Sequence, residues 1–300
     1  MIFYSHRNTK NDKIERGFVK VREIVERENE AYEAFPSIKK SLFNTVPYAD
    51  KEAFLDSLCS PAQVFDFGVD FDFGVDFSAE FVISENMITP NGTLSPDAER
   101  RVRNFVRKYH KKMDLLCEFA LINGKRTSAL FEGVTLKLST YDEKALFESE
   151  RPLMHVSGVQ SNYLGGKCFG DEEELRRGIG QLARKVFDMK DENGDALEYK
   201  ADTLILPSNR PVLEEKIKRI APEYQMSVVK LPNWQTDKDS VMVMSSESNA
   251  NLLGNLLVEN EPLMITDWYD KYTGNYIWQG RCRFGVGFCN YKHILLAEDQ

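Results

Sequence analysis

The sequence predicts an α+β fold in which extended segments project from compact domains. Three observations support this prediction. Residues 65–77 alternate strictly between apolar and polar side chains, which is the period of a β-strand. Apolar residues then recur at helical spacing between Ser95 and Asn123. Between residues 171 and 239, helical patterns alternate with short apolar runs, and a β-rich tail follows. We therefore expect two domains with arms rather than one compact core.

The composition is that of a soluble folded protein. Apolar residues make up 42% of the 300 residues and charged residues 29%, which is too apolar for a disordered chain. The 39 Lys and Arg against 47 Asp and Glu give a net charge of −8. A chain that coats nucleic acid needs clustered cations to neutralise phosphates, so this balance argues against that class. It leaves open a protein that lies near nucleic acid without binding it tightly.

The spacing of the cysteines and the length of the apolar runs indicate in which compartment the chain folds. The five cysteines are widely spaced, and no C-x-x-C motif occurs. The first residues, MIFYSHRNTKNDK, reach charged side chains within a few positions, and no apolar run approaches the ~20 residues of a membrane helix. We therefore expect a reduced, intracellular folding compartment with free thiols, no membrane segment and no structural zinc site.

The N-terminal elements are helical. An amphipathic pattern begins near Ile14 and ends at Pro36, which cannot continue a helix. Two shorter helices are expected at residues 37–44 and 49–58. Residues 1–27 carry a local charge of +3, against the acidic trend of the whole chain.

A perfect repeat follows these helices. Residues 65–70 read FDFGVD, and residues 71–76 repeat the six letters. Because six is even, the pleat stays in phase, and one face of the strand carries only apolar side chains. At ~3.3 Å per residue the stretch spans roughly 40 Å. A turn at Pro90-Asn-Gly92 closes the segment, so we expect an extended hairpin or arm. A bare arm of this kind invites aggregation, which a covering subunit would prevent.

The strongest helix signal comes next. Ser95 is a good N-cap, Pro96 suits the first helical position, and acidic residues occupy the first turn. The helix should end at Asn123-Gly124 and is therefore long, at roughly 39 Å. Its exposed face is rich in Arg and Lys, diluted by nearby acids, and lacks interleaved aromatic residues for base stacking. A solvated or subunit-contacting face is the preferred interpretation.

The remaining elements are shorter. Residues 127–160 read as short strands and loops. The α/β unit should contain a helix at 171–188, a strand at 203–206, a helix at 211–220 and a strand at 228–229. We further expect an apolar run at 241–244, a helix at 249–258 and strands at 263–268, 276–286 and 291–296.

No motif predicts a catalytic centre. The triplet Asp-Phe-Gly occurs twice, but no glycine-rich phosphate loop or H-R-D motif accompanies it. Alternate aspartates on a strand lie roughly 6.6 Å apart, too far to share one Ca²⁺ without ligands from another segment. The histidines have no metal-ligand spacing, and no G-x-S-x-G motif occurs. We expect no catalytic residue, no cofactor and no metal.

One part of the chain resembles a known family. Leu175–Phe187 has a helical pattern, Lys190-Asp-Glu-Asn-Gly194 is a turn, and Ala201-Asp-Thr-Leu-Ile-Leu-Pro207 is a strand that leads into a helix at Pro211–Ile220. Phe131-Glu-Gly133 and Ser161-Asn162 precede this unit. The order of motifs resembles the tailed-bacteriophage major capsid proteins, and the local motifs are most similar to the Mu-like head subunit group. Residues 95–300 are similar in architecture, and the FDFGVD repeat has no counterpart there.

The resemblance implies a domain organisation. Residues 1–60 would be an N-terminal arm, and residues 61–94 an extended β loop that lies over an adjacent subunit. Residues 95–168 would form a peripheral domain with a long spine helix, joined by a β tail at 241–300. Residues 169–240 would form an α/β axial domain.

The resemblance also implies a function. The chain would be a major capsid protein that self-assembles, through hexamers and pentamers, into an icosahedral shell around packaged double-stranded DNA. It would assemble in the cytoplasm of a bacterial host and reside in the virion. Its partners would be other copies of itself, with scaffold, portal and decoration proteins as further partners, and its contact with DNA would be weak and non-specific.

The expected contact residues lie on the arm and on the long helix. The apolar arm face should contact a neighbouring subunit, and the candidates are Phe65, Phe67, Val69, Phe71, Phe73, Val75 and Phe77. The candidate charged contacts between subunits are Asp66, Asp70, Asp72, Asp76, Arg101, Arg107 and Lys108. Three alternatives stay open: a shell of the same fold around protein cargo, a metal-dependent enzyme that uses the aspartate strand, and an accessory or tail protein with an adhesive arm.

Overall fold

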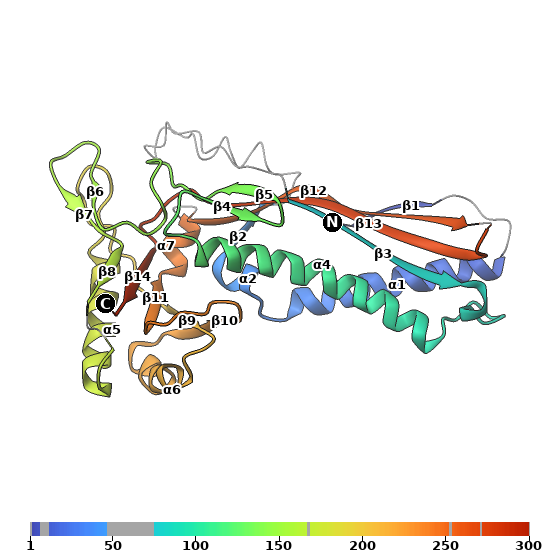
Figure 1. Cartoon of the computed structure of the whole chain (residues 1–300), viewed down its shortest axis with the longest axis horizontal. Helices are drawn as coiled ribbons and strands as arrows, with labels where there is room; N and C mark the ends of the chain where they lie inside the picture. The colour runs from blue at the N-terminus through green and yellow to red at the C-terminus, as the bar shows by residue number, and fades with distance from the viewer. Residues whose placement is uncertain are drawn as a thin grey trace.

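The molecule is elongated, with a compact α/β unit at one end and a long sheet covered by helices extending from it (Figure 1). A computed structural model describes residues 2–6, 12–46, 75–166, 169–251, 254–270 and 272–299. Helices and strands are both abundant, so the predicted α+β class is confirmed. The predicted helix at 49–58 and residues 65–74 of the repeat lie outside the described residues.

The long sheet, called here the first sheet, has the strand order β1-β12-β13-β3, and β2 also pairs with β12. Its core is the antiparallel hairpin of β12 and β13. The strand β3 is antiparallel to β13, whereas β1 and β2 are parallel to β12. The strands are β1 Ile2–His6, β2 Asn44–Val46, β3 Val75–Ser84, β12 Asn255–Asp270 and β13 Asn275–Phe288.

Two long helices cover one face of the first sheet. They are α1 Asp12–Ala34 and α4 Pro96–Ile122, with the short α2 Ile38–Leu42 and the 3₁₀ turn η2 Glu85–Met87 beside them. The helix α4 begins as the sequence predicts, because the Ser95 hydroxyl accepts a hydrogen bond from the amide of Ala98 and Pro96 follows the cap. Phe81 of β3 packs against Phe105 of α4, with ring centroids 5.3 Å apart.

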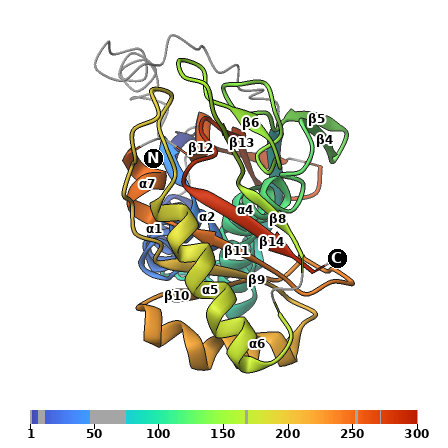
Figure 2. The ribbon, with the colours of Figure 1, turned by 90° about the vertical axis from the view of Figure 1, so that its left-hand side faces the viewer.

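The α/β unit is built on the second sheet, of order β10-β9-β11-β14-β8. Its strands are β8 Tyr163–Gly165, β9 Thr203–Pro207, β10 Ser227–Leu231, β11 Ser240–Met244 and β14 Ile294–Glu298. The helices α5 Glu172–Phe187 and α6 Pro211–Ile220 pack beside it (Figure 2). The remaining described elements are short. They are the 3₁₀ turn η3 Ala221–Tyr224, the helix α7 Ser246–Asn251, the hairpin of β4 Ser128–Phe131 and β5 Val134–Lys137, and the hairpin of β6 Arg151–Pro152 and β7 Val159–Gln160.

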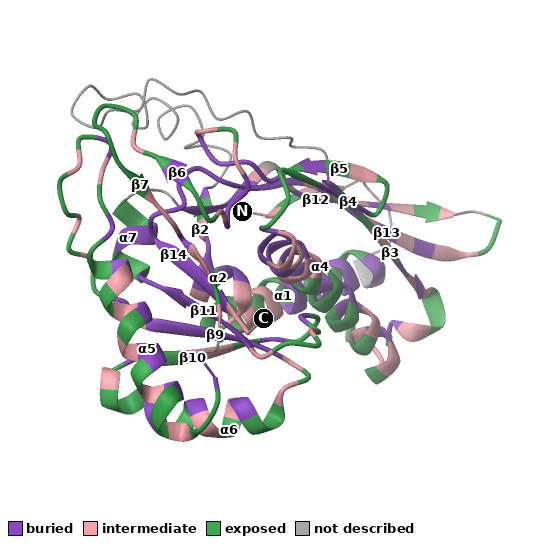
Figure 3. Ribbon diagram, turned by 60° about the vertical axis from the view of Figure 1, so that its left-hand side comes forward, coloured by how far each residue is buried: buried purple, intermediate pink, exposed green. Residues whose placement is uncertain are grey.

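The central strands β9 and β11 of the second sheet are buried on both faces (Figure 3). Leu204 of β9 and Val243 of β11 join the core beneath α5 and α6. Ile205 and Met242, on the other face of the same strands, join the larger core that contains α4 and the first sheet. The strands therefore read as continuous apolar runs, because neither face is left for solvent.

One sequence expectation is corrected by this topology. The predicted helix at 249–258 is wrong: α7 ends at Asn251, and β12 begins at Asn255. The side-chain oxygen of Asn249 accepts the amide of Asn255 at 2.7 Å, which turns the chain from helix into strand. The sheet of the α/β unit includes β8, β14 and most of β11, which lie outside the range 169–240 expected for the axial domain.

Candidate assembly surface

A groove runs between the edge strand β3 and the flank of α4, and we call it the β3–α4 groove. It consists of two adjoining hollows of about 650 Å³ and 300 Å³ that share Glu80 and Lys108. The strand side is lined by residues 76–82 and the helix side by Arg101, Asn104, Phe105, Lys108, Lys111, Lys112 and Leu115. The helix-side residues recur every three or four positions and so form one stripe of α4.

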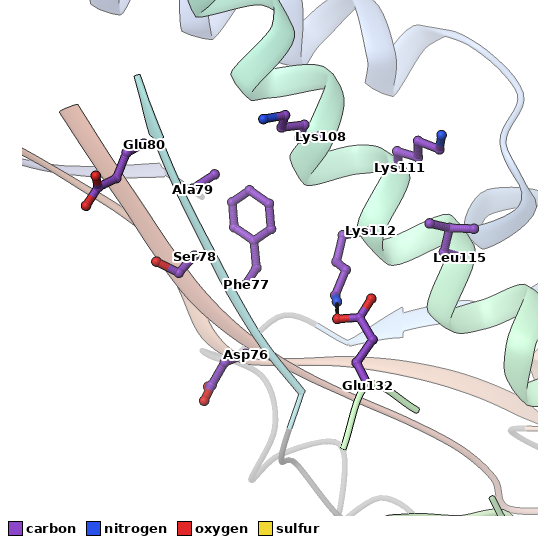
Figure 4. Close-up of a pocket in the computed structure, with 10 residues that line it drawn as sticks. All are labelled: Asp76, Phe77, Ser78, Ala79, Glu80, Lys108, Lys111, Lys112, Leu115 and Glu132. Atoms are coloured by element: carbon purple, nitrogen blue, oxygen red, sulfur yellow. Dashed lines mark hydrogen bonds and ion pairs between the residues drawn. The ribbon is translucent and has the colours of Figure 1, made fainter. Parts of the chain in front are cut away.

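The alternation of β3 shapes the groove. Phe77 and Phe81 are buried beneath α4, whereas Asp76, Ser78 and Glu80 are exposed on the opposite face. Figure 4 shows Phe77 pointing toward the helix while the three polar side chains point away from it. The floor is therefore apolar and backbone-rich, and the helix side carries cations.

The strand side of the groove is a sheet edge that is free of pairing among the described residues. The strand β3 pairs with β13, and among the described residues no strand pairs with its other edge. The guanidinium of Arg101 donates to the carbonyl oxygen of Val82 at 2.8 Å, so that carbonyl faces the groove. Because backbone groups of an antiparallel strand alternate in direction, those of Ser78 and Glu80 face the groove as well.

The cations of the groove differ in how they are paired. Arg101 forms an ion pair with Asp97 at 3.0 Å. Lys112 forms an ion pair with Glu132, drawn as a dashed line in Figure 4. Lys108 and Lys111 are exposed and form no ion pair within the described part of the chain. With respect to the described residues, the positive charges of Lys108 and Lys111 therefore remain unpaired along the rim.

The acids of β3 are held on the outer face. Asp76 accepts a hydrogen bond from Arg283 of β13 at 2.8 Å, and this carboxylate raises the pKa of the guanidinium. Glu80 accepts from the side-chain amide of Gln279 at 2.8 Å. Asp76, one of the expected charged contacts between subunits, is thus paired inside the chain.

The structure locates only part of the expected arm. Val75 and Phe77 are 2% and 6% exposed and pack in the core of their own chain, so they offer little side-chain surface to a neighbouring subunit. Phe77 lies 5.6 Å from Tyr109 between ring centroids. Their burial has a simple cause, since β3 is already part of the first sheet at Val75. The remaining candidates on the arm lie outside the described residues. They are the apolar Phe65, Phe67, Val69, Phe71 and Phe73 and the acidic Asp66, Asp70 and Asp72.

The expected cations on α4 separate into two groups. Arg101 and Lys108 line the β3–α4 groove, together with Lys111 and Lys112, which were expected only as part of the exposed basic face. Arg107 is exposed and does not line the groove. Its helical position, one residue before Lys108, turns it away from the stripe.

A buried polar cluster was missed at the sequence level. The carboxylate of Glu192 pairs with the ammonium of Lys292, accepts from the hydroxyl of Tyr141 and accepts from the amide of Met154 at 3.0 Å. Burial alone would raise the pKa of Glu192, but the hydrogen bonds from Lys292 and Tyr141 outweigh it and lower that pKa. The cluster joins four segments of the chain, one around each of Tyr141, Met154, Glu192 and Lys292. The only sequence signal was the D-E-N-G turn, which does not indicate that its glutamate is buried.

Other functional classes find little support in the described residues. No group of three or more His, Cys, Asp or Glu side chains among them is arranged to hold a metal ion. The helices in the described ranges include none that is both long and apolar enough to cross a bilayer.

The comparisons with known proteins concern the fold. No protein-family model and no curated protein matches the sequence. The structure is similar to that of a phage-related protein from Bordetella bronchiseptica RB50, with 14% identity, a TM-score of 0.50 and coverage of 91% of this chain and 95% of that chain. It is also similar to a virus-like particle from Pyrococcus furiosus, with 11% identity, a TM-score of 0.47 and coverage of 93% and 98%. A third similar structure is the mature capsid of bacteriophage PhiM1, with 11% identity, a TM-score of 0.40 and coverage of 80% and 77%. The chain therefore shares its fold with a phage-related protein over nearly the full length of both, in agreement with the resemblance seen in the sequence.

Proposed function

We propose that this chain is a major capsid protein of a tailed phage or prophage, which self-assembles into the icosahedral shell that encloses double-stranded DNA. The observation that carries the proposal is the fold shared with a phage-related protein over 91% of this chain and 95% of that one. The K-D-E-N-G turn and the strand-proline-helix order of the α/β unit support it from the sequence. Among the tailed-phage major capsid proteins, the proposal assigns the chain to the Mu-like head subunit group.

The domain roles follow the two ends of the molecule. The α/β unit would be the axial domain at the centre of hexamers and pentamers. The first sheet with α4 would be the peripheral domain, with α4 as its spine helix. Residues 1–60 would be the N-terminal arm, whose strands β1 and β2 pair with β12 of this peripheral domain, and the extended loop within 61–94 would reach an adjacent subunit.

The proposed mechanism is geometric. Many weak contacts, repeated around the shell, sum to a closed container, so no residue needs to be catalytic. The β3–α4 groove would supply one such contact, with Arg101, Lys108 and their neighbours facing acids of another subunit. A net charge of −8 would keep contact with packaged DNA weak. Scaffold, portal and decoration proteins would be further partners of a shell that assembles in the host cytoplasm.

Electron microscopy of the expressed protein tests the function. Closed icosahedral particles are the expected result, and digestion of external nucleic acid followed by extraction identifies their contents. Particles that enclose a single copurifying protein in place of DNA would assign the chain to the protein-cargo shells. A stable monomer at high concentration would overturn the shell function itself.

A further inference from the structure

We propose that the Lys292 side chain forms an amide bond with the Glu192 carboxylate of the same chain, with loss of one water. The link would lie between the turn after α5 and the segment before β14. It goes beyond the proposed shell function and does not depend on it. It gives a chemical role to the buried cluster, which the assembly surface leaves unused.

The two reacting groups are in contact and shielded from water. The Lys292 ammonium donates a hydrogen bond to Oε1 of Glu192. The two side chains are 3% and 6% exposed. Among the lysine ion pairs of the described ranges, this is the one in which both side chains are less than a tenth exposed. Holding an amine and a carboxyl group together in this way makes their reaction effectively intramolecular.

The site is walled by two aromatic rings. Tyr141 and Tyr291 are stacked with ring centroids 6.0 Å apart, and the Lys292 nitrogen lies 5.3 Å and 5.4 Å from these centroids. Burial lowers the pKa of Lys292, although the Glu192 carboxylate acts in the opposite direction. Burying two charges is costly, whereas an amide in their place buries none. Removal of the two charges therefore favours condensation.

Both carboxylate oxygens of Glu192 are held by donors. The Tyr141 hydroxyl donates to Oε1, and the backbone amide of Met154 donates to Oε2 at 3.0 Å. An amide directed at Oε2 stabilises the negative charge that develops there during attack by a nucleophile. The hydrogen bonds from Lys292 and Tyr141 lower the pKa of Glu192, so the proton that the reaction needs comes from the ammonium itself.

The step balances in atoms and charge. The ammonium transfers one proton to Oε1, which leaves a neutral amine and a carboxylic acid. The amine nitrogen then forms a bond to Cδ of Glu192, and Oε2 carries the negative charge beside the Met154 amide. The bond from Cδ to Oε1 breaks as a second proton moves from nitrogen to Oε1 through the Tyr141 hydroxyl. One water leaves, and no other reactant is consumed.

The link would join segments that are distant in the sequence. Glu192 follows α5, and Lys292 precedes β14, which lies between β11 and β8 in the second sheet. A bond between them closes a loop of about 100 residues in the unfolded chain and so reduces the entropy gained on unfolding. The C-terminal strand would thereby be tied covalently to the turn after α5.

The mass of the chain tests the link. Full-length protein that is purified folded and then denatured should be about 18 Da lighter, by one water, than the same chain recovered unfolded from inclusion bodies. Digestion should release a branched peptide that contains residues 192 and 292, and the linked protein should run as a single chain in a denaturing gel. Equal masses would overturn the proposal, and so would a loss of water mapped to other residues.

Variants of the pair separate the bond from the fold. Lys292→Met removes the nucleophile, and Glu192→Leu/Lys292→Met also removes the buried charge that the single variant leaves unpaired. Neither variant should lose water. The control Lys230→Met removes the exposed lysine that contacts Glu214 at 2.6 Å, and it should lose water as wild type does. Loss of water in the folded double variant would contradict the assignment.

The variant Tyr141→Phe tests the proton transfer. It keeps the ring but removes the hydroxyl that contacts Oε1 of Glu192. After refolding, the lighter species should form at least about tenfold more slowly than in wild type. The control Tyr163→Phe, which removes a hydroxyl that contacts Glu298, should follow wild type. Equal rates in the two variants would refute the role of the Tyr141 hydroxyl.

The mass measurement is independent of assembly, because it is made on the denatured chain. Particles built from chains of unaltered mass would overturn the link and leave the shell function standing. A linked chain that stays monomeric at high concentration would support the link and overturn the shell function.

Discussion

Single residues determine how closely α4 approaches the first sheet. Gly280 of β13 lies beneath the helix, and a Cβ atom there would come within 2.3 Å of the Phe105 ring. We predict that Gly280→Ala lowers the free energy of unfolding by about 1–3 kcal/mol, since the ring has no room to move without disturbing its neighbours. Chemical denaturation of the subunit measures this change.

The cause of that loss can be isolated with a second substitution. Phe105→Leu removes the ring that the new methyl group would meet, at its own cost in packing. Adding Gly280→Ala to a Phe105→Leu background should therefore cost less than adding it to wild type. Equal costs in the two backgrounds would contradict a direct clash.

A buried histidine influences how the stability of the molecule depends on pH. His110 of α4 is 4% exposed, stacks on Tyr32 of α1 and lies 2.9 Å from the side-chain oxygen of Asn29. Burial, with the nearby Lys39 ammonium, lowers the pKa of His110 to about 4, although Glu33 acts in the opposite direction. The native state therefore disfavours the proton that an unfolded histidine accepts near its ordinary pKa of about 6.5.

This depressed pKa predicts acid sensitivity. The stability contributed by neutral His110 is complete above pH 6.5 and is lost as pH falls toward 4. Between pH 7.5 and 5 the loss from this residue should be about 2 kcal/mol. In urea denaturation His110→Gln should lose correspondingly less stability over this interval, whereas His155→Gln, at an exposed position, should follow wild type. A wild-type pH dependence in His110→Gln would assign the acid sensitivity to other groups, such as the buried His293 with its pKa near 3.

Residue roles were predictable only where local pattern defines them. Ser95 as a cap and Lys108 as an exposed cation both follow from their positions on a helical repeat. The burial of His110 and of Glu192 depends on partners that lie far away in the sequence, namely Asn29 and Lys292. A single sequence holds no local trace of such pairs.

At the scale of elements, the start of α4 is set by a cap. The Ser95 hydroxyl lies 3.3 Å from the amide of Ala98, and the first turn carries Asp97 and Glu99. We predict that Ser95→Ala destabilises the subunit by about 1 kcal/mol, while Ser95→Asp stays within a few tenths of wild type. Chemical denaturation of both variants measures the difference. An alanine variant as stable as the aspartate one would show that tertiary packing alone fixes this end.

The predicted helix at 249–258, whose second half is strand β12, shows where periodicity fails to separate helix from strand. Leu256, Leu257 and Val258 of β12 are all buried, so this stretch lacks the alternation that marks a half-exposed strand. A short run buried on both faces has the same appearance as a buried helix. The edge strand β3, with one exposed face, kept its alternation and was predicted correctly from Val75 onward.

At the scale of the whole molecule, the second sheet is shared by two cores. Ile205 and Leu204 are neighbours on β9, and each belongs to a different core. The strand β14 comes from the end of the chain and inserts between β11 and β8. Pairings between segments this far apart in the sequence were not predicted, and the resemblance implied only that residues 241–300 belong to the peripheral domain. The consequence is that the α/β unit and the elongated part should unfold together.

The contact between Glu118 and Asn233 allows a test of whether the α/β unit and the elongated part unfold together. Glu118 of α4 is 2% exposed, and its carboxylate accepts both the backbone and the side-chain amide of Asn233 in the α/β unit. Glu118→Ala leaves these donors buried without a partner, so the free energy of unfolding should fall by about 1.5–3 kcal/mol. Two reporter variants, each with a single tryptophan, follow the two cores: one keeps only Trp278 in the larger core, and the other has only the tryptophan of Phe169→Trp in the core beneath α5 and α6. In denaturant both signals should shift by the same amount, because the shared sheet cannot lose one core and keep the other. A shift of the Phe169→Trp transition alone would show that the two ends unfold independently.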